Sequence, residues 1–284
     1  MPKLFIVGTP IGNLEDITLR AIRVLKEVGL IAAEDTRVTR KLLSHFEIHT
    51  RLLSYNENNR AATIPKLLIE LESLDIALVS DAGMPGINDP GHHLVEAARA
   101  AGFEVEAVPG PSAVTTAISV AGIPLEQFTY LGFLPRRKST RLKLLDSMAA
   151  TTHALVALET PHRLQASLAD LQQALGDRRI AVCRELTKLH EEVFNGAISE
   201  AIEHFSEPRG EITLVIEGAQ FNAHDDAASE DTAKQMLSDL RGQNVRSKEA
   251  VSTVVEATGL SRSRVYSLWV ASQNDGGTPR RKTP

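Results

Sequence analysis

The chain of 284 residues contains a single cysteine, Cys183. One thiol excludes an intramolecular disulfide framework and any zinc or iron–sulfur site built from several cysteines. No apolar run approaches the roughly 20 residues that cross a bilayer, and the four apolar residues after Lys3 are too few for a secretory signal. Membrane-spanning, secreted and disordered classes are therefore disfavoured, and we expect a cytoplasmic protein that binds no membrane.

Two common nucleotide-binding motifs are also missing. The loop at residues 8–13 (GTPIGN) lacks the third glycine of the dinucleotide fingerprint, and no Gly-Lys-Ser/Thr follows as in a phosphate-binding loop. This disfavours a dinucleotide-dependent dehydrogenase. His162 and the pair His92 and His93 have no partners at metal-ligand spacing, so we expect surface or cleft histidines and no metal.

The net charge of −5 is distributed unevenly along the chain. Residues 241–284 hold eight basic and three acidic residues, a net charge of +5, whereas the rest of the chain carries −10. A basic end on an acidic body is common in proteins that bind a polyanion. Short segments also fluctuate by a few charges by chance, so charge alone leaves nucleic-acid contact open.

Short apolar runs alternate with longer amphipathic ones over the first two-thirds of the chain. The short runs are rich in Val, Ile and Leu, which predicts strands. They lie at residues 3–8, 30–33, 76–80, 105–108, 154–158, 180–183 and 212–217. Helical stripes such as Leu164, Leu168, Leu171 and Leu175 lie between them. This alternation predicts α/β layers with a largely parallel sheet, in which ligands bind at the carboxyl ends of strands.

Two breaks interrupt this pattern. Residues 132–138 (GFLPRRK) end one strand–helix set before the next begins, and the polar stretch 218–229 precedes helical patterns only. The expected organisation is an N-terminal α/β lobe at residues 1–132, a second α/β lobe at 133–222, a C-terminal helical module at 230–275 and a disordered basic tail at 276–284.

Three loops rich in glycine and proline follow expected strands, at residues 8–13, 80–91 (SDAGMPGINDPG) and 109–113 (PGPSA). Each alone has a plain interpretation: a turn for the first, and helix caps at Asp89 and Ser112 for the others. The second loop is longer than a plain turn, and ordered long loops are usually functional. Small residues after the third loop would admit a ligand at a helix N-terminus. Together the loops predict one binding site.

Together with five further motifs, in order, these loops resemble the tetrapyrrole methylase superfamily of S-adenosylmethionine-dependent methyltransferases, in its branch acting on small-subunit ribosomal RNA. The further motifs are residues 33–37 (AEDTR), 132–135 (GFLP), 159–163 (ETPHR), 184–188 (RELTK) and 210–218 (GEITLVIEG). The resemblance runs from residue 3 to residue 218 and resumes in the C-terminal helices. It implies the class III methyltransferase fold, in which two α/β lobes fold the cofactor into the cleft between them, plus a small all-helical C-terminal module.

The resemblance implies that S-adenosylmethionine is the cofactor. The residues implied to hold it are Pro10, Gly83, Met84, Pro85, Ile87, Ser112, Ala113, Leu158, Leu186, Glu211, Ile212 and Thr213. The second loop would hold the methionine part and sulfonium, and the third loop the amino-acid end or ribose. The two leucines would flank the adenine, the last three residues would read its edge through the backbone, and Pro10 would close the cleft beside the methyl group. Met84 stands where related small-molecule methylases carry an aspartate.

Transfer of a methyl group from a sulfonium needs no metal and no nucleophilic side chain, so alignment is the main task. A ribose 2′-hydroxyl is a poor nucleophile, and a nearby proton acceptor would help. The candidates are Glu34, Asp35, Asp89, Glu159 and Glu185. We favour Asp35 and Glu159 as catalytic residues, although Glu34, Asp35 and Asp89 could cap helices and Glu185 could pair with a neighbouring cation.

Arginines are natural phosphate ligands, which makes Arg37, Arg163 and Arg184 candidates for RNA contact. Lone surface arginines are more often solvated. In the C-terminal module, helical patterns occupy residues 231–240, 247–258 and 261–272. The last two resemble a helix-turn-helix, with Arg262 and Arg264 where such modules meet nucleic acid. The alternative is a helical hairpin packed on the body.

The resemblance implies 2′-O-methylation of the cytidine at position 1402 of 16S rRNA, within the assembled 30S subunit, by a homodimer. Two alternatives stay open. An enzyme of the same fold could act on a small tetrapyrrole, although a free small substrate would not require a basic helical module. A ligand-sensing DNA-binding regulator would instead bind a specific duplex sequence and transfer no methyl group.

Overall fold

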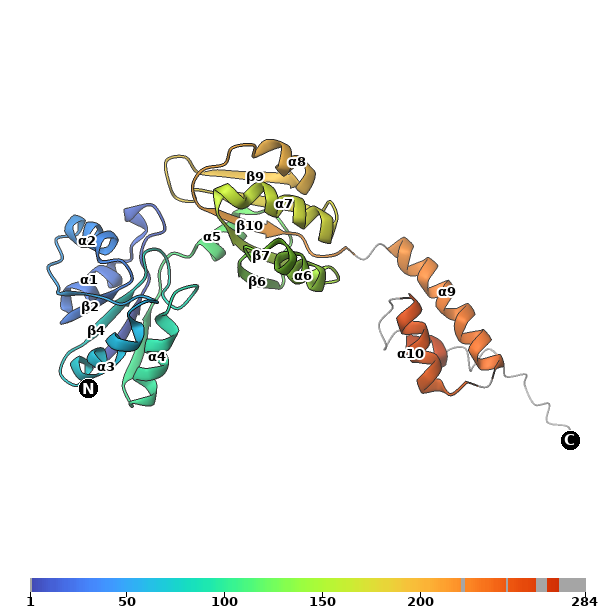
Figure 1. The fold of residues 1–284 in the computed structure, drawn as a ribbon, viewed down its shortest axis with the longest axis horizontal. Helices are drawn as coiled ribbons and strands as arrows, with labels where there is room; N and C mark the ends of the chain where they lie inside the picture. The colour runs from blue at the N-terminus through green and yellow to red at the C-terminus, as the bar shows by residue number, and fades with distance from the viewer. Residues whose placement is uncertain (1, 221–222, 244, 259–264, 271–284) are drawn as a thin grey trace, which may run out of the picture. The chain divides into compact units, whose positions relative to one another are not determined.

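The computed structural model describes residues 2–220, 223–243, 245–258 and 265–270, with the backbone alone at 223–230 and 256 (Figure 1). The chain divides into two compact units, Met1–Ala219 and Gln220–Pro284. The first unit carries two five-stranded sheets, and the described part of the second is helical. No described helix combines the length and apolar character that a bilayer crossing needs.

The first sheet is parallel throughout, in the order β3-β2-β4-β1-β5. Its strands are β1 (Lys3–Val7), β2 (Leu30–Ala33), β3 (Leu52–Ser54), β4 (Ile76–Val79) and β5 (Glu104–Val108). Helices α1 (Leu19–Glu27) and α2 (Thr36–His45) cover one face, and α3 (Arg60–Leu71) and α4 (Gly91–Ala100) cover the other. Because both faces are covered, β2 and β4 are buried at every residue, which explains their continuous apolar sequences.

The strand order brings the three glycine-rich loops together. β4, β1 and β5 are parallel neighbours, so the loops that follow them leave the same edge of the sheet. The amide of Thr9 donates to the Gly83 carbonyl at 2.9 Å, and the amide of Gly83 donates back to Thr9 at 3.1 Å. Gly8 lies so close to Gly110 that a Cβ on Gly8 would be 2.7 Å from the Gly110 Cα. The expected convergence of the loops is confirmed.

The second sheet is mixed, in the order β6-β7-β10-β8-β9. Its strands are β6 (Phe128–Phe133), β7 (Ala154–Glu159), β8 (Arg179–Arg184), β9 (Glu192–Ala197) and β10 (Ile212–Ile216). Only β6 and β7 are parallel, because β10 returns antiparallel between β7 and β8, and β9 pairs antiparallel with β8. The prediction of a largely parallel sheet is therefore correct for the first lobe and wrong for the second.

Helices cover both faces of this second sheet. α6 (Lys138–Met148), α7 (Pro161–Leu175) and α8 (Ile198–His204) pack on one face. α5 (Ala113–Val120) packs on the other face, beside Ile11 of the first loop. The expected boundary at residues 132–133 falls inside β6, which begins at Phe128 and pairs with β7. The proline and the basic residues there follow β6 and lead into α6, so the change of sheet comes before β6.

The second unit contains α9 (Ala223–Gly242), α10 (Ser247–Thr258) and helical residues 265–270. Apolar side chains of the three helices, including Leu237, Val254 and Trp269, form a separate core. α9 begins within the polar stretch 218–229 that was expected to separate the second lobe from the helical module, and the alanines there favour a helix. The Arg241 guanidinium lies 4.1 Å from the centre of the Trp269 ring, a cation–π contact.

Two of the expectations for this unit fall on residues outside the described ranges. Residues 259–264 include Arg262 and Arg264 together with the turn of the expected helix-turn-helix, and residues 271–284 include the expected basic tail. The nucleic-acid role of this module therefore stays a prediction.

Candidate functional site

A cavity of about 460 Å³ lies at the edge where the loops of the first lobe meet the second sheet. Ten of the twelve residues implied to hold the cofactor line it: Gly83, Met84, Ile87, Ser112, Ala113, Leu158, Leu186, Glu211, Ile212 and Thr213. Pro10 and Pro85 are not among the lining residues, and the first loop contributes Ile11 instead. Because β10 is antiparallel to its neighbours, its start at Ile212 lies at the same edge as the ends of β7 and β8.

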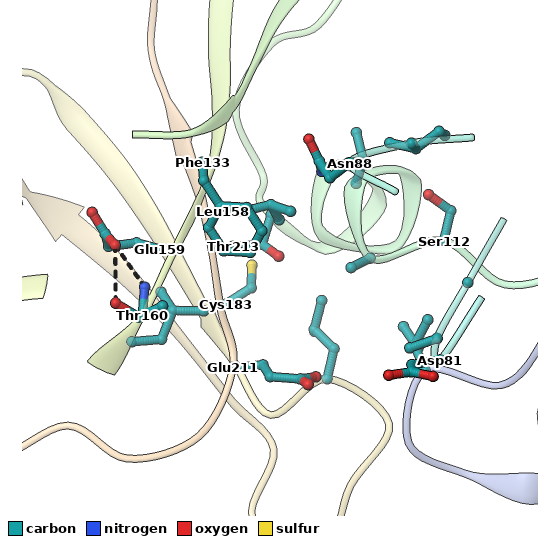
Figure 2. Close-up of a pocket in the computed structure, with 18 of the residues that line it drawn as sticks. Asp81, Asn88, Ser112, Phe133, Leu158, Glu159, Thr160, Cys183, Glu211 and Thr213 are labelled. Atoms are coloured by element: carbon teal, nitrogen blue, oxygen red, sulfur yellow. Dashed lines mark hydrogen bonds between the residues drawn. The ribbon is translucent and has the colours of Figure 1, made fainter. Parts of the chain in front are cut away.

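One wall of the cavity is a row of side chains across the second sheet. Thr213 on β10 pairs in register with Leu158 on β7 and with Cys183 on β8, and Figure 2 shows the three close together. Strand side chains alternate between faces, so the neighbouring Ala157 and Leu214 join the core beneath α7. Burial raises the pKa of the Cys183 thiol to about 12. The wall is thus mostly apolar and uncharged at neutral pH.

Two carboxylates of the first lobe border the cavity on its other side. Glu34 follows β2 and Asp81 follows β4, which are neighbouring strands. The Asp81 amide donates to Glu34 Oε2 at 3.3 Å, and the Asp35 amide donates to Asp81 Oδ1 at 2.9 Å. Burial raises the pKa of both carboxyls, and repulsion from neighbouring carboxylates raises it further. No lysine or arginine is found among the described lining residues, so the cavity suits a cation.

The side chain of Asp35 serves a helix end rather than the cavity. Asp35 is not among the lining residues, and its carboxylate caps α2 by accepting from the Arg37 amide at 2.8 Å. It also pairs with the Arg37 guanidinium at 2.6 Å. These hydrogen bonds, the side-chain ones first, lower the pKa of Asp35 to about 2. The Asp35 carboxylate is therefore occupied by the helix cap and the ion pair, and its catalytic role stays a prediction.

Glu159 borders the cavity, but its carboxylate is used in internal contacts. The side chain is fully buried and pairs with Arg163 at 2.7 Å. It also accepts from the Thr160 amide at 2.7 Å and from the Ser167 hydroxyl at 2.5 Å. Figure 2 shows Glu159 beside Thr160, on the opposite side of the view from Asp81. These contacts fix the first turns of α7 against β7, which is an anchoring role.

Each described arginine that was expected to contact RNA has a carboxylate partner. Arg37 pairs with Asp35, Arg163 with Glu159 at 2.7 Å, and Arg184 with Glu192 at 2.8 Å. The last two arginines are also largely buried, with 18% and 21% of their side chains exposed. Each of the three thus makes a local ion pair, and their contact with RNA stays a prediction.

A contact between Asn88 and Tyr130 joins the two lobes beside the cavity. Asn88 lies in the second loop with a left-handed φ of 65°, and its amide nitrogen donates to the Tyr130 hydroxyl at 2.5 Å. A Cβ on Gly132 would be 3.1 Å from Asn88 Oδ1, so a glycine there permits the approach. Asn88 and Tyr130 both line the cavity and were not singled out from the sequence.

Asp81 lines the cavity but was not singled out from the sequence, although a signal was present. Asp81 follows a fully buried strand of the first sheet almost immediately, and the carboxyl ends of parallel strands are where ligands bind. Glu34 was among the proton-acceptor candidates but was not favoured. Within the described part of the chain, no three His, Cys, Asp or Glu side chains are grouped as metal ligands.

Comparisons with known proteins agree with this architecture. Residues 3–202 match the family model described as Tetrapyrrole (Corrin/Porphyrin) Methylases. A Thermotoga maritima protein named ribosomal RNA small subunit methyltransferase I is 51% identical over 223 residues, which is 78% of this chain and 100% of that protein. A Bacillus subtilis protein of the same name is 41% identical, covering 96% of each chain.

Solved structures resemble the first unit at low sequence identity. The uroporphyrin-III-C-methyltransferase of Thermus thermophilus has a TM-score of 0.55 at 21% identity and covers 76% of this chain and 94% of its own. A cobalt precorrin-4 methyltransferase has a TM-score of 0.59 at 15% identity, covering 76% of this chain and 94% of its own. At these identities the likeness concerns the fold alone.

Proposed function

Because this chain belongs to the tetrapyrrole methylase family, we propose that it uses S-adenosylmethionine to methylate the ribose 2′-hydroxyl of a cytidine in 16S rRNA. The names of relatives in Thermotoga maritima and Bacillus subtilis support ribosomal RNA as the substrate. The observation that carries the proposal is the cavity itself, which has an apolar wall in the second lobe and, in the first, the half-buried Glu34 and the exposed Asp81, both with a raised pKa. A ligand with an aromatic end and cationic groups matches that combination.

The residues present fit this cofactor, which supplies a methyl group on a positively charged sulfur. We propose that the second loop, through Gly83, Met84 and Ile87, holds the methionine part. Ser112 and Ala113 would contact its amino-acid end or the ribose. Leu158 and Leu186 would flank the adenine, with the backbone at 211–213 at its edge.

Glu34 and Asp81 are the carboxylates that we propose for the reaction in place of Asp35 and Glu159. They line the cavity, and they balance positive charge there without a competing lysine or arginine among the described lining residues. Because their pKa values are raised, they also accept a proton more readily than ordinary carboxylates. The remaining contribution of the chain is to align the acceptor with the methyl group.

The decisive experiment is transfer of label from radiolabelled S-adenosylmethionine to 30S subunits that lack the modification. Label at the ribose of a 16S rRNA cytidine, mapped by nuclease digestion and mass spectrometry, is the expected result. Label on a tetrapyrrole precursor, or on no RNA at all, would overturn the proposal. We further propose a cytoplasmic homodimer acting on the assembled 30S subunit, and sedimentation of the purified protein would test the dimer.

A further inference from the structure

A second cavity, of about 710 Å³, adjoins the first and shares Phe133 and Thr160 with it. It lies where β6 and β7 end and where α6 and α7 begin, because its lining runs from Phe133 to Arg136 and from Thr160 to Arg163. A ligand in the first cavity and a ligand in the second would therefore both lie against these two shared side chains. A single ligand that filled both cavities would pass them.

The two cavities differ in the sign of their charge. Carboxylates occur among the residues that line the first cavity, where the described lining includes no lysine or arginine. The second is lined by Arg136, His162 and Arg163, and the described residues around it include no Asp or Glu. The positive end of the α7 dipole adds to this potential, since Thr160 is the N-cap of that helix. The first cavity therefore suits a cation, and the second an anion.

Arg136 is the cation of this cavity that is free to bind a ligand. Its side chain is exposed, and within the described ranges its guanidinium makes no ion pair or hydrogen bond. Arg163, by contrast, is held by Glu159 at 2.7 Å and donates to the Leu134 carbonyl at 2.6 Å. Arg163 thus shapes the cavity while Arg136 faces solvent at its edge.

Phe133 presents a large apolar surface beside these charges. Its side chain is 51% exposed, which is unusual for a phenylalanine at the end of a strand that packs in a sheet. Figure 2 shows Phe133 next to Leu158 of the first cavity. An exposed aromatic ring beside an unpaired arginine is the combination with which proteins hold a single-stranded nucleotide, because the base stacks on the ring and the phosphate meets the guanidinium.

The wall that carries Phe133 and Arg136 is held in place from beneath. Arg141 of α6 donates to the Pro135 carbonyl at 3.0 Å and is itself fixed by Asp170 of α7 through its Nε at 2.8 Å. Both side chains of this pair are almost completely buried. A wall fixed before the ligand arrives lowers the entropy lost on binding.

We propose that the second cavity is the subsite for the acceptor nucleotide, with its base stacked on Phe133 and its phosphate at Arg136. The ribose would then lie at Phe133 and Thr160, where the two cavities meet. This assignment rests on the proposed function, because it takes the ligand of the first cavity to be the methyl donor. It adds the residues by which the chain recognises its RNA.

The test compares four substitutions with wild type in the full chain. Phe133→Leu removes the ring and Phe133→Tyr retains it, while Arg136→Gln removes the charge and Arg136→Lys retains it. Arg99→Gln, at an exposed position of α4 outside both cavities, controls for loss of one positive charge. The measurements are the KM for unmodified 30S subunits, filter binding of those subunits without cofactor, and calorimetric binding of S-adenosylmethionine.

We expect Phe133→Leu to raise both the KM and the dissociation constant for 30S subunits by about 5-fold to 100-fold. Arg136→Gln should weaken binding and reduce the slope of log affinity against log monovalent salt by about 0.7–0.9, the loss of one phosphate contact. Phe133→Tyr, Arg136→Lys and Arg99→Gln should stay near wild type. The dissociation constant for S-adenosylmethionine should change by less than about twofold in the Arg136 variants. That is well below the tenfold change that corresponds to 1.4 kcal/mol.

The outcomes separate this inference from the proposed function. If wild type methylates 30S subunits while Phe133→Leu and Arg136→Gln leave the KM, the filter binding and the salt slope unchanged, the subsite is overturned and the function stands. If wild type transfers no methyl group but its binding to 30S subunits still depends on Phe133 and Arg136, the function is overturned and the RNA subsite stands. If binding depends on neither residue and no methyl is transferred, both are overturned.

Discussion

At the scale of single residues, the approach of the first and third loops depends on two glycines. A Cβ on Gly8 would lie 2.7 Å from the Gly110 Cα and 2.7 Å from Met84 Sδ, and a Cβ on Gly110 would lie 2.9 Å from the backbone of Gly8. The methionine side chain can move aside, but the backbone of Gly110 can retreat only by separating the loops. Position 8 requires a glycine because a Cβ has no room there. Its backbone conformation is not one that only glycine adopts.

We expect Gly8→Ala to destabilise the protein by about 1–3 kcal/mol, the usual cost of overpacking. It should also weaken S-adenosylmethionine binding, because Ser112 and Ala113 of the displaced third loop line the cavity. Denaturant unfolding and calorimetry measure the two effects. Gly242→Ala is the matched control, since a Cβ there meets no atom within 4 Å. Equal behaviour of the two variants would show that the loops tolerate separation.

The carboxylates at the cavity predict a dependence on pH. Burial raises the pKa of Glu34 and Asp81 in the folded chain, so folding favours their protonated forms. Their contribution to stability is therefore present at low pH and lost as the pH rises through the raised pKa values. Glu34→Gln should accordingly raise the melting temperature of the protein without cofactor at neutral pH, which calorimetry can measure.

The same titration should act on the cofactor in the opposite direction. Affinity for the sulfonium should increase as the pH rises from the ordinary carboxyl value of 4.5 through the raised values, and then become constant. Glu34→Gln should flatten this rise and weaken binding near neutral pH by about tenfold, equivalent to 1.4 kcal/mol. Glu96→Gln, on the exposed surface of α4, should match wild type. An affinity that did not vary with pH in wild type would contradict this role.

The sequence identified most of the cavity lining but did not single out Asp81, and it favoured Asp35 and Glu159 over Glu34. Few purely structural roles require loops this rich in glycine, so the sequence indicated that these loops form a binding site. Leu158 and Glu159, by contrast, are successive residues of β7 and point to opposite faces of the sheet. Both residues line the cavity, but the Glu159 carboxylate contacts Arg163 and Ser167, and nothing in the sequence indicates those contacts. The cap formed by Asp35 could have been foreseen, because an Asp that precedes a helix commonly accepts from the amide of its second residue.

At the scale of elements, the strands that the sequence did not reveal are β3, β6 and β9, all at sheet edges. Their side chains are partly exposed, so their sequences lack the continuous apolar runs of the interior strands. The sequence did not predict strand order or direction either. β10 lies antiparallel between β7 and β8 because of pairing between strands that are far apart in the sequence. Strand existence was predictable for all the described interior strands and, among the edge strands, for β5 alone.

The pair of Arg141 and Asp170 joins α6 to α7 and predicts a large effect on stability. Only 5% and 4% of these side chains are exposed. Asp170→Ala would leave a buried guanidinium without its counter-charge, at a cost of about 3–5 kcal/mol. Asp146→Ala, at an exposed position of α6, should change stability by less than about 0.5 kcal/mol. Urea unfolding compares them, and a loss below 1 kcal/mol for Asp170→Ala would show that the arginine finds another partner.

At the scale of the whole molecule, the two units have separate cores. The family match ends at residue 202, and the whole Thermotoga maritima relative corresponds to 78% of this chain. A chain that ends at Ala219 should therefore fold and bind S-adenosylmethionine with wild-type affinity. It should lose affinity for 30S subunits, because the basic residues of the C-terminal unit would be gone.

Calorimetry and filter binding test both parts of this prediction. Loss of cofactor binding would show that the first unit depends on the second. Unchanged affinity for 30S subunits would show that the C-terminal unit makes no contact with the RNA.

The single cysteine has a practical consequence. Cys183 stands in the cavity wall beside Thr213 and is the one thiol of the chain. With a pKa of about 12 it is almost entirely protonated near neutrality, and so reacts slowly with alkylating agents. Because the chain has one thiol, a maleimide can attach a probe at one place only. If the proposed donor occupies the cavity, it should slow that attachment, and the time course tests this with no need for an RNA substrate.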